Sequence, residues 1–432
     1  MSNVVEIVDA MMGSHKTSKI CKWMEENNHM YKFFYISPLL EEVKDGGRIQ
    51  QACPLTRFVA PETKRDDEDN RHDTKGSHLL ELLRIGANIT CTHNLYLNMT
   101  DEHFSEMEKH NYVLVVDEEI AMIDDYHAYS APDVTSLIEL GVISVQENDG
   151  MLIWCGKDID SNLDKAFDDF RHKYSKFKRH VQNKMLYVSK RKDDMFVTQL
   201  PVKLITSSKR AIILTYMFEG NILSSFLKLK GIPYKVFDEI TPIIPSKKEI
   251  AKLINLYSPT NQKWKKDLKL SVSAYSKMSA QDIKHIEGYI LSIARSWRAS
   301  SYDLLYTFPK NRSNLDVKSK AAKIKPSGLV DTELKIQKCP ENVCWLASNT
   351  RATNAYRHKT CVIHAYDRYP NQSVASYLQD YGYPINADVF ALSEMLQFIW
   401  RSAIRDGKPI NLAILSKRMK DLFLDWLQEE NI

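Results

Sequence analysis

Short hydrophobic runs alternate with longer amphipathic segments through the first half of this chain. The runs end in polar residues or proline, and their β-branched and aromatic content is typical of buried strands. They cover residues 4–8, 31–38, 88–93, 112–116 and 210–215. Helical periodicity occupies 18–26 and 79–83 between them. This alternation predicts an α/β fold with a doubly wound parallel sheet.

The second half repeats the pattern after a polar stretch at 246–278 that lacks strand-like runs. We predict helices at 280–298, 389–405 and 416–430, and strands at 302–309, 343–347 and 360–364. A chain of 432 residues is long enough for two such domains. We therefore predict α/β domains at 1–245 and 246–432, the first with a possible basic insertion at 160–195.

A phosphate-binding loop is predicted directly after the first strand. Residues 10–17 have the sequence Ala-Met-Met-Gly-Ser-His-Lys-Thr, which lies between a predicted strand and a predicted helix. Backbone amides around Gly13, Ser14 and His15, with the helix N-terminus, can hold phosphate oxygens. Lys16 would reach the β- and γ-phosphates, and the Thr17 hydroxyl would bind Mg²⁺. The predicted ligands are therefore ATP and Mg²⁺.

His15 departs from the usual loop pattern, which has glycine at this position. Glycine lets the backbone curl closely around phosphate, although histidine is among the better tolerated residues in left-handed conformations. Its ring can also add a donor to phosphate. Two hypotheses follow: an ATP-driven motor, or a nucleic-acid-binding module whose degenerate nucleotide site does not hydrolyse ATP.

Two acidic residues end the buried strand that begins at residue 112. Asp117 and Glu118 would lie at the carboxyl edge of a parallel sheet, where ligands of such sheets bind. Asp117 could enter the Mg²⁺ shell, and Glu118 could orient or deprotonate the attacking water.

Net charge, cysteine spacing and hydropathy limit the kinds of partner and cellular environment that we expect. The net charge of +4 is small, so contact with a polyanion would require local basic patches. Seven cysteines without metal-like spacing indicate reduced thiols. No segment is long and apolar enough to span a membrane, and no signal-peptide core is present. With the first strand at Val4, we also expect no upstream motif that contacts the nucleotide base, and therefore weak base selectivity.

The order of these segments resembles the superfamily 2 helicases, and most closely the small DNA-replication helicases of bacteriophages. In the first half the matching segments are 10–17, 36–39, 89–93, 117–119 and 214–216. In the second half they are 349–354 and 397–407. The resemblance spans nearly the whole chain and implies two RecA-like domains with the nucleotide in the cleft between them.

The resemblance also implies roles for individual residues. Thr215 would couple nucleotide state to domain closure. A further set would contact a nucleic-acid backbone without determining sequence: Ser37, Pro38, Thr90, Thr92, His93, Arg351, Thr353 and Asn354. Serine, threonine, asparagine and proline are also common at strand ends, helix caps and turns, so a purely structural role is the alternative for these residues.

Three polar residues of the predicted helix 389–405 share one helical face, because Gln397, Arg401 and Arg405 are spaced four apart. By resemblance, Gln397 would contact ATP and the arginines would sense its γ-phosphate as arginine fingers. The family spacing between its arginines is one residue shorter, and we favour Arg405 over Arg401.

Two basic runs, 171–192 and 310–325, could follow a nucleic-acid strand, and aromatic residues are interleaved in the first. An exposed charged helix explains these runs equally well. The sequence therefore predicts an ATP-dependent helicase or translocase acting on single-stranded or forked DNA, with RNA left open. By resemblance the setting is phage replication in the cytoplasm of a bacterial host, with other viral replication proteins as partners.

Overall fold

The computed structural model describes residues 4–63, 74–126, 131–155, 168–190, 195–258, 268–313, 322–326, 340–350 and 354–428. The chain forms two compact units. Unit 1 comprises Met1–Asp9, Ile20–Ile240 and Pro370–Asn386, and unit 2 comprises Ala10–Lys19, Thr241–Tyr369 and Ala387–Ile432. The boundary predicted at 245 and 246 lies beside the passage from Ile240 to Thr241, while the segments 10–19 and 370–386 change units.

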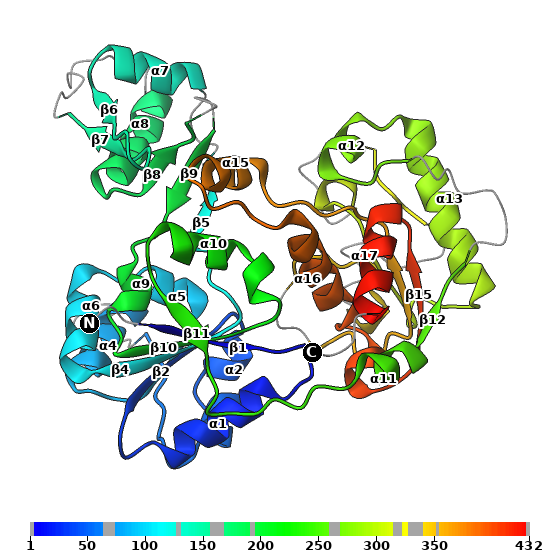
Figure 1. Ribbon diagram of the computed structural model, residues 1–432, viewed down its shortest axis with the longest axis horizontal. Coiled ribbons are helices and arrows are strands. Elements are labelled where there is room, and N and C mark those ends of the chain that lie inside the picture. Colours follow the sequence, from blue (N-terminus) through cyan, green and yellow to red (C-terminus); the bar gives the residue numbers. More distant parts are fainter. Residues whose placement is uncertain are drawn as a thin grey trace, which may run out of the picture. The chain divides into compact units, whose positions relative to one another are not determined.

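Unit 1 is built on a six-stranded sheet in which every pair of neighbours is parallel (Figure 1). Its strands, in spatial order, are β11 (Tyr234–Val236), β1 (Val5–Asp9), β10 (Arg210–Thr215), β4 (Tyr112–Asp117), β2 (Lys32–Ser37) and β3 (Ile89–Thr92). Each of the five runs predicted in the first half is confirmed as a strand of this sheet.

Helices cover both faces of this sheet. The helices of unit 1's main body are α1 (Lys16–Glu26), α2 (Leu40–Val43), α3 (Arg48–Ala52), α4 (Lys75–Arg84), α5 (His93–Leu97), α6 (Asp101–His110), η2 (Phe218–Gly220), α9 (Lys203–Thr206) and α10 (Ile222–Leu229). Alternate residues of one strand enter different cores: Phe34 packs with α4, α5 and α6, whereas Phe33 packs with α1. Burial on both faces explains why the strands are continuously apolar.

A small subdomain is inserted between β4 and α9. It contains β5 (Ile123–Asp125), α7 (Ala131–Glu139), β6 (Ile143–Val145), β7 (Leu152–Trp154), α8 (Asp168–Gln182), β8 (Leu186–Val188) and β9 (Phe196–Gln199). Its strands form antiparallel sheets, β5-β9-β8 and β6-β7. Val134, Phe177 and Leu186 are buried in a separate apolar core of this subdomain.

A segment from the second half of the chain returns to unit 1. Helix α15 (Gln372–Asp380) packs against β5, β9 and α10. Val374 and Leu378 are fully buried in the unit 1 core, and the Tyr377 hydroxyl donates to the Asp149 carbonyl oxygen at 2.6 Å. Nothing in the local sequence distinguishes this helix from those of unit 2.

Unit 2 contains a four-stranded parallel sheet with the order β12 (Ile254–Leu256), β15 (Ile410–Ile414), β14 (Cys361–His364) and β13 (Leu304–Thr307). Its helices are α11 (Lys247–Lys252), α12 (Val272–Lys277), α13 (Ala280–Ser296), α16 (Ala387–Ile399) and α17 (Lys417–Gln428). Single turns lie at η3 (Lys310–Arg312), η4 (Pro340–Asn342) and η5 (Ala403–Asp406). The predicted α/β class, with two parallel-sheet domains, is confirmed.

Two predicted elements of the second half are wrong. Residues 343–347 form only an isolated bridge to β13, between Trp345 and Tyr306, instead of a strand. The helix predicted to reach 405 ends at Ile399. The Ser402 hydroxyl donates to the Ile399 carbonyl at 2.7 Å, and the Ala403 amide donates to the Lys359 carbonyl at 2.9 Å. These bonds replace the next helical turn.

Candidate nucleotide-binding site

Three polar residues end neighbouring strands at the carboxyl edge of the unit 1 sheet. The register pairs Asp9 of β1 with Thr215 of β10, and the preceding Leu214 with Asp117 of β4. The three strands are adjacent and parallel, so these residues end them side by side. Parallel sheets bind ligands at this edge.

The predicted phosphate loop begins directly after Asp9 and leads into α1. Gly13 has φ +82° and His15 has φ +61°, so both residues adopt the left-handed backbone that a tight loop needs. The Ser14 amide donates to the Met11 carbonyl at 3.2 Å, and Lys16 begins the helix. His15 therefore takes the conformation for which glycine is usual, as histidine can.

The loop offers donors that suit a phosphate group. The Lys16 amine is turned into the loop, where it donates to the carbonyl oxygens of Ala10 and Met11, the latter at 3.2 Å. The Ser14 hydroxyl is buried and has no hydrogen-bond partner among the described residues. A phosphate oxygen would satisfy this hydroxyl, and the helix N-terminus favours an anion.

Asp117 is held from two sides. The Tyr35 hydroxyl donates to Asp117 Oδ2 at 2.8 Å, and His93 Nε2 lies 3.0 Å from the Asp117 carbonyl oxygen. Burial, with the charge of Asp117, raises the pKa of Tyr35 well above its usual value, so this phenol stays a neutral donor. A carboxylate oriented in this way is a ligand of the type that Mg²⁺ accepts.

The described residues contain no group of three or more His, Cys, Asp and Glu side chains able to hold a metal without further ligands. Magnesium in phosphate-binding sites is usually held by one or two carboxylates, with phosphates and water completing the shell. Asp117 is a carboxylate of this kind.

Glu118 and Glu119 have different surroundings. Glu118 has φ +63°, and its amide donates to the Leu214 carbonyl at 3.1 Å, which fixes the turn after β4 to β10. Glu119 Oε1 accepts hydrogen bonds from the Thr215 hydroxyl at 2.8 Å and from the Asn221 side-chain amide. Asn221 also donates to the Thr215 hydroxyl at 3.2 Å.

Sequence reasoning missed Asp9, Glu119 and Asn221. Asp9 Oδ1 accepts from the Met217 amide at 2.7 Å, and Oδ2 accepts from the Phe218 amide at 3.0 Å. Asp9 therefore holds the turn that follows β10. Its position as the polar residue ending the first strand was the only indication in the sequence.

Several of the described residues predicted to contact nucleic acid are buried or bonded within local structure. The side chains of Ser37 and Thr90 are fully buried, and the Thr90 hydroxyl donates to the Val43 carbonyl at 2.9 Å. The Thr92 hydroxyl caps α5 by accepting from the Leu95 amide at 3.4 Å. Pro38 is half-buried and Asn354 exposed, while Arg351 and Thr353 lie outside the described residues.

The predicted polar face of Gln397, Arg401 and Arg405 does not form, because α16 ends before either arginine. Gln397 Nε2 donates to the Ser393 hydroxyl at 3.2 Å, and Arg401 is only 2% exposed. Arg405 lies in η5 and is half-buried. Its carbonyl oxygen would be 3.7 Å from a Cβ built on Gly13, so its backbone lies beside the phosphate loop.

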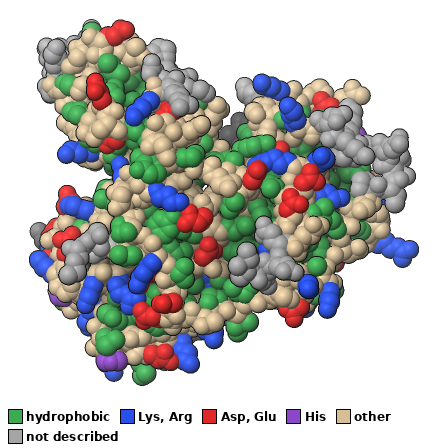
Figure 2. Space-filling view, in the orientation of Figure 1, with side chains coloured by type: hydrophobic (Ala, Val, Ile, Leu, Met, Phe, Trp, Pro, Cys, Tyr) green, Lys and Arg blue, Asp and Glu red, His purple; other side chains and the backbone are tan. Residues whose placement is uncertain are grey.

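The basic runs give limited support for a nucleic-acid track. Phe177 and Tyr187, which the sequence suggests for base stacking, are buried. Part of each run lies outside the described residues. Figure 2 shows Lys and Arg side chains interspersed with Asp and Glu on the face that it draws. The charge distribution there is mixed.

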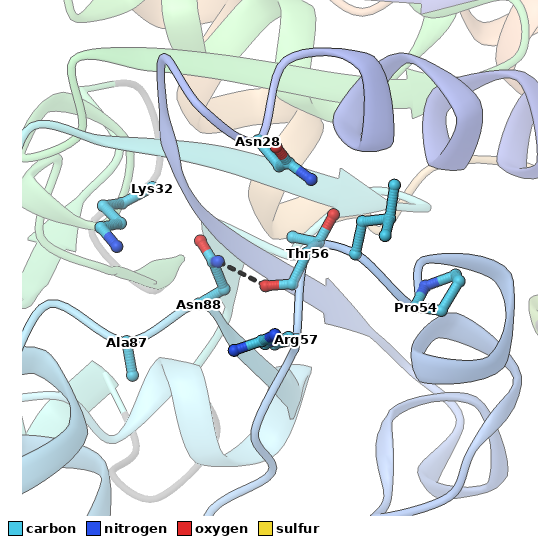
Figure 3. Close-up of a pocket in the computed structure, with 8 residues that line it drawn as sticks. Asn28, Lys32, Pro54, Thr56, Arg57, Ala87 and Asn88 are labelled. Carbon is cyan, nitrogen blue, oxygen red and sulfur yellow. Dashed lines mark hydrogen bonds between the residues drawn. The ribbon is translucent and has the colours of Figure 1, made fainter.

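A separate hollow of about 660 Å³ lies at the amino-terminal edge of the unit 1 sheet (Figure 3). Lys32 begins β2 and Asn88 precedes β3, so this hollow is at the edge away from Asp117. Asn88 Nδ2 donates to the Thr56 carbonyl at 2.6 Å, which ties the two walls together. This pocket includes no residue of the predicted nucleotide site.

Two further properties bear on the protein's setting. The six cysteines among the described residues form no disulfide with one another. No helix in the described part of the chain has the length and apolarity needed to cross a membrane.

Comparison with known proteins gives a family match and a full-length relative. Residues 248–427 match the family described as the YonV C-terminal Rossmann-like domain. The chain is 28% identical over 433 residues to the SPbeta prophage-derived uncharacterized protein YonV of Bacillus subtilis (strain 168), covering 99% of both chains.

Solved structures with some similarity include an XPD helicase, with 14% identity, a TM-score of 0.44, and coverage of 99% of this chain and 90% of the other. S. tokodaii Xpd4 has 12% identity and a TM-score of 0.47, covering 98% and 94%. A DEAD box protein from Methanococcus jannaschii has 11% identity and a TM-score of 0.26, covering 99% and 86%.

Proposed function

We propose that this protein is an ATP-dependent nucleic-acid helicase or translocase, of superfamily 2 type, that acts on DNA in phage replication. One observation supports it above the others: β1, β10 and β4 are adjacent and parallel. Their carboxyl ends bring Asp9, Thr215 and Asp117 side by side, and the predicted phosphate loop follows Asp9 directly in the chain. Motifs far apart in the sequence are thereby brought to one place.

In this proposal the chain binds and orients the triphosphate of ATP. The loop amides and Lys16 hold the β- and γ-phosphates, and Thr17 and Asp117 hold Mg²⁺. Magnesium, when bound, neutralises charge that develops on the phosphates. Glu118, directly after Asp117, orients the attacking water and accepts its proton.

Arg405 is the better candidate for sensing the γ-phosphate. Its backbone lies beside Gly13, and its side chain is half-buried, whereas Arg401 is almost fully buried. An arginine that reaches the transferring phosphate only in a closed state makes hydrolysis depend on conformation. The placement of ATP between the two domains stays a prediction.

Thr215, the residue proposed to couple nucleotide state to domain closure, donates a hydrogen bond to Glu119. A change at the end of β4 would reach β10 through the Thr215 and Asn221 hydrogen bonds to Glu119. We infer that this three-residue network transmits the nucleotide state to the segment after β10.

The prophage origin of the similar protein YonV supports a phage setting. From it we infer action in the cytoplasm of a bacterial host, with viral replication proteins as partners. DNA is the proposed strand and RNA the alternative.

The decisive experiment is steady-state ATP hydrolysis with and without single-stranded DNA, for wild type, Lys16→Ala and Lys22→Ala. Lys22 is the matched control, because it lies on the same helix α1 with a 75% exposed side chain. We expect DNA to stimulate hydrolysis in the wild type and Lys22→Ala, and Lys16→Ala to abolish it.

The other outcome also has a definite meaning. Salt-sensitive DNA binding without hydrolysis in the wild type would favour the binding module with a degenerate site. Restoration of hydrolysis by His15→Gly would then identify His15 as the cause, since Gly adopts φ +61° without strain.

A further inference from the structure

The segment that joins β11 to α11 runs along the strand and loop that form the proposed ATP site. At its start, the Phe237 amide donates to the Ile7 carbonyl of β1 at 2.9 Å. Further along, the Ile243 amide donates to the Ser14 carbonyl of the phosphate loop at 3.0 Å. The hydrogen bond to Ser14 lies within unit 2, which contains both residues.

This joining segment is apolar and conformationally restricted at that point. Its sequence is Pro-Ile-Ile-Pro at 242–245. Proline fixes its own φ and keeps the residue before it extended, so Ile244 has little backbone freedom, while Ile243 is held by its hydrogen bond to Ser14. Their side chains are nevertheless 58% and 54% exposed. An exposed aliphatic residue, Ile243, is thus bonded through its backbone to the phosphate loop, and a second exposed isoleucine follows it in the chain.

The nucleobase of a bound nucleoside triphosphate is a group that could pack on one of these two isoleucines. Base, ribose and triphosphate are one covalent unit, so a triphosphate held by the loop leaves its base near the loop. A nucleobase has a flat, weakly polar face that packs on aliphatic side chains. Burial of the exposed side chain removes apolar surface from water and favours binding.

We propose that Ile243 is the apolar contact for the base of the bound nucleoside triphosphate. The inference rests on the proposed function and adds to it the residue that receives the base. Successive side chains of an extended segment point to opposite sides, so Ile243 and Ile244 cannot both face one base. Ile243 is assigned because its own backbone is bonded to the loop.

This contact predicts low selectivity among bases. An isoleucine side chain has no hydrogen-bond donor or acceptor, so it cannot distinguish the polar edges of adenine and guanine. ATP and GTP should therefore lose affinity together when Ile243 is replaced.

The test compares wild type, Ile243→Ser and Ile244→Ser by calorimetric titration with Mg·ATP and with magnesium tripolyphosphate. Ile244→Ser is the matched control, because it makes the same chemical change at a neighbour of similar exposure. We expect Ile243→Ser to raise the Kd for ATP about tenfold, from lost burial of one partly exposed isoleucine. Its Kd for tripolyphosphate, and both values for Ile244→Ser, should stay within about twofold.

Each other result has its own meaning. Equal weakening of ATP and tripolyphosphate by Ile243→Ser would show a disturbed loop and overturn the base contact. Unchanged ATP binding, or an effect confined to Ile244→Ser, would also overturn the assignment. Wild-type protein that binds neither probe would instead refute the proposed function.

Discussion

Lys359 is a buried lysine whose charge should make the stability of unit 2 depend on pH. Its side chain is fully buried, and its amine donates to the Ser301 carbonyl at 2.7 Å. Burial lowers the pKa of Lys359 from 10.5 to about 8, and the nearby Asp303 and Glu341 offset this only in part. The folded protein therefore holds this proton less tightly than the unfolded chain does.

The sign and size of the effect follow from linkage. Between pH 8 and 10.5 the unfolded chain binds more protons at Lys359, so the free energy of unfolding rises with pH in that window. At about 1.4 kcal/mol per pKa unit, the full effect is about 3 kcal/mol. Of this change in the free energy of unfolding, about 2 kcal/mol should appear between about pH 7 and about pH 9.5.

The measurement is urea unfolding of wild type and Lys359→Met at those two pH values, with unit 2 followed by pulse proteolysis and mass spectrometry. Methionine has a similar shape and no charge. The free energy of unfolding of Lys359→Met should therefore lack the pH-dependent contribution of Lys359. Other titrating groups, including the buried tyrosines, are common to both proteins and cancel in the difference. Equal pH dependence in the two proteins would refute the reasoning.

Three other perturbations test other parts of the molecule. Replacing Asn221 with Ala removes its hydrogen bond to Glu119 and should reduce DNA stimulation of ATP hydrolysis several-fold with little change in the KM for ATP; an unchanged stimulation would argue against the coupling network. Leu378→Ala should lower the free energy of unfolding of unit 1 by about 2–5 kcal/mol in urea titrations, whereas Gln379→Ala, at an exposed neighbouring position, should change it little. Among the described cysteines, Cys155 alone is exposed and should be the first alkylated in the native protein; mass spectrometry finding a buried one labelled as fast would contradict this.

Much of the fold could be predicted because local patterns and tertiary packing agree. The five apolar runs of the first half became neighbouring strands of one sheet, since burial on both faces requires such runs. The strand-loop-helix arrangement around residues 10–17 was predicted correctly because it depends on local properties, while phosphate binding by that loop stays a prediction. His15, the one departure, adopts a left-handed backbone that its residue type tolerates.

Errors arose where distant segments replaced local bonds. The helix predicted through Arg405 ends at Ile399 because the Ala403 amide bonds to Lys359, far away in sequence. Thr90 is typical of a strand end in the sequence, yet its hydroxyl is satisfied by the Val43 carbonyl and fully buried. Periodicity carries no information about such partners.

The sequence by itself determined the α/β class, the turn within residues 10–17 between a strand and a helix, and the acidic strand end, because each depends on residues close together in the chain. Only the tertiary structure decided that α15 joins unit 1, that Glu119 rather than Glu118 meets Thr215, and that Ile243 lies against the loop. Those contacts join residues remote in sequence. Their free energy depends on the packing of whole elements, which no local pattern encodes.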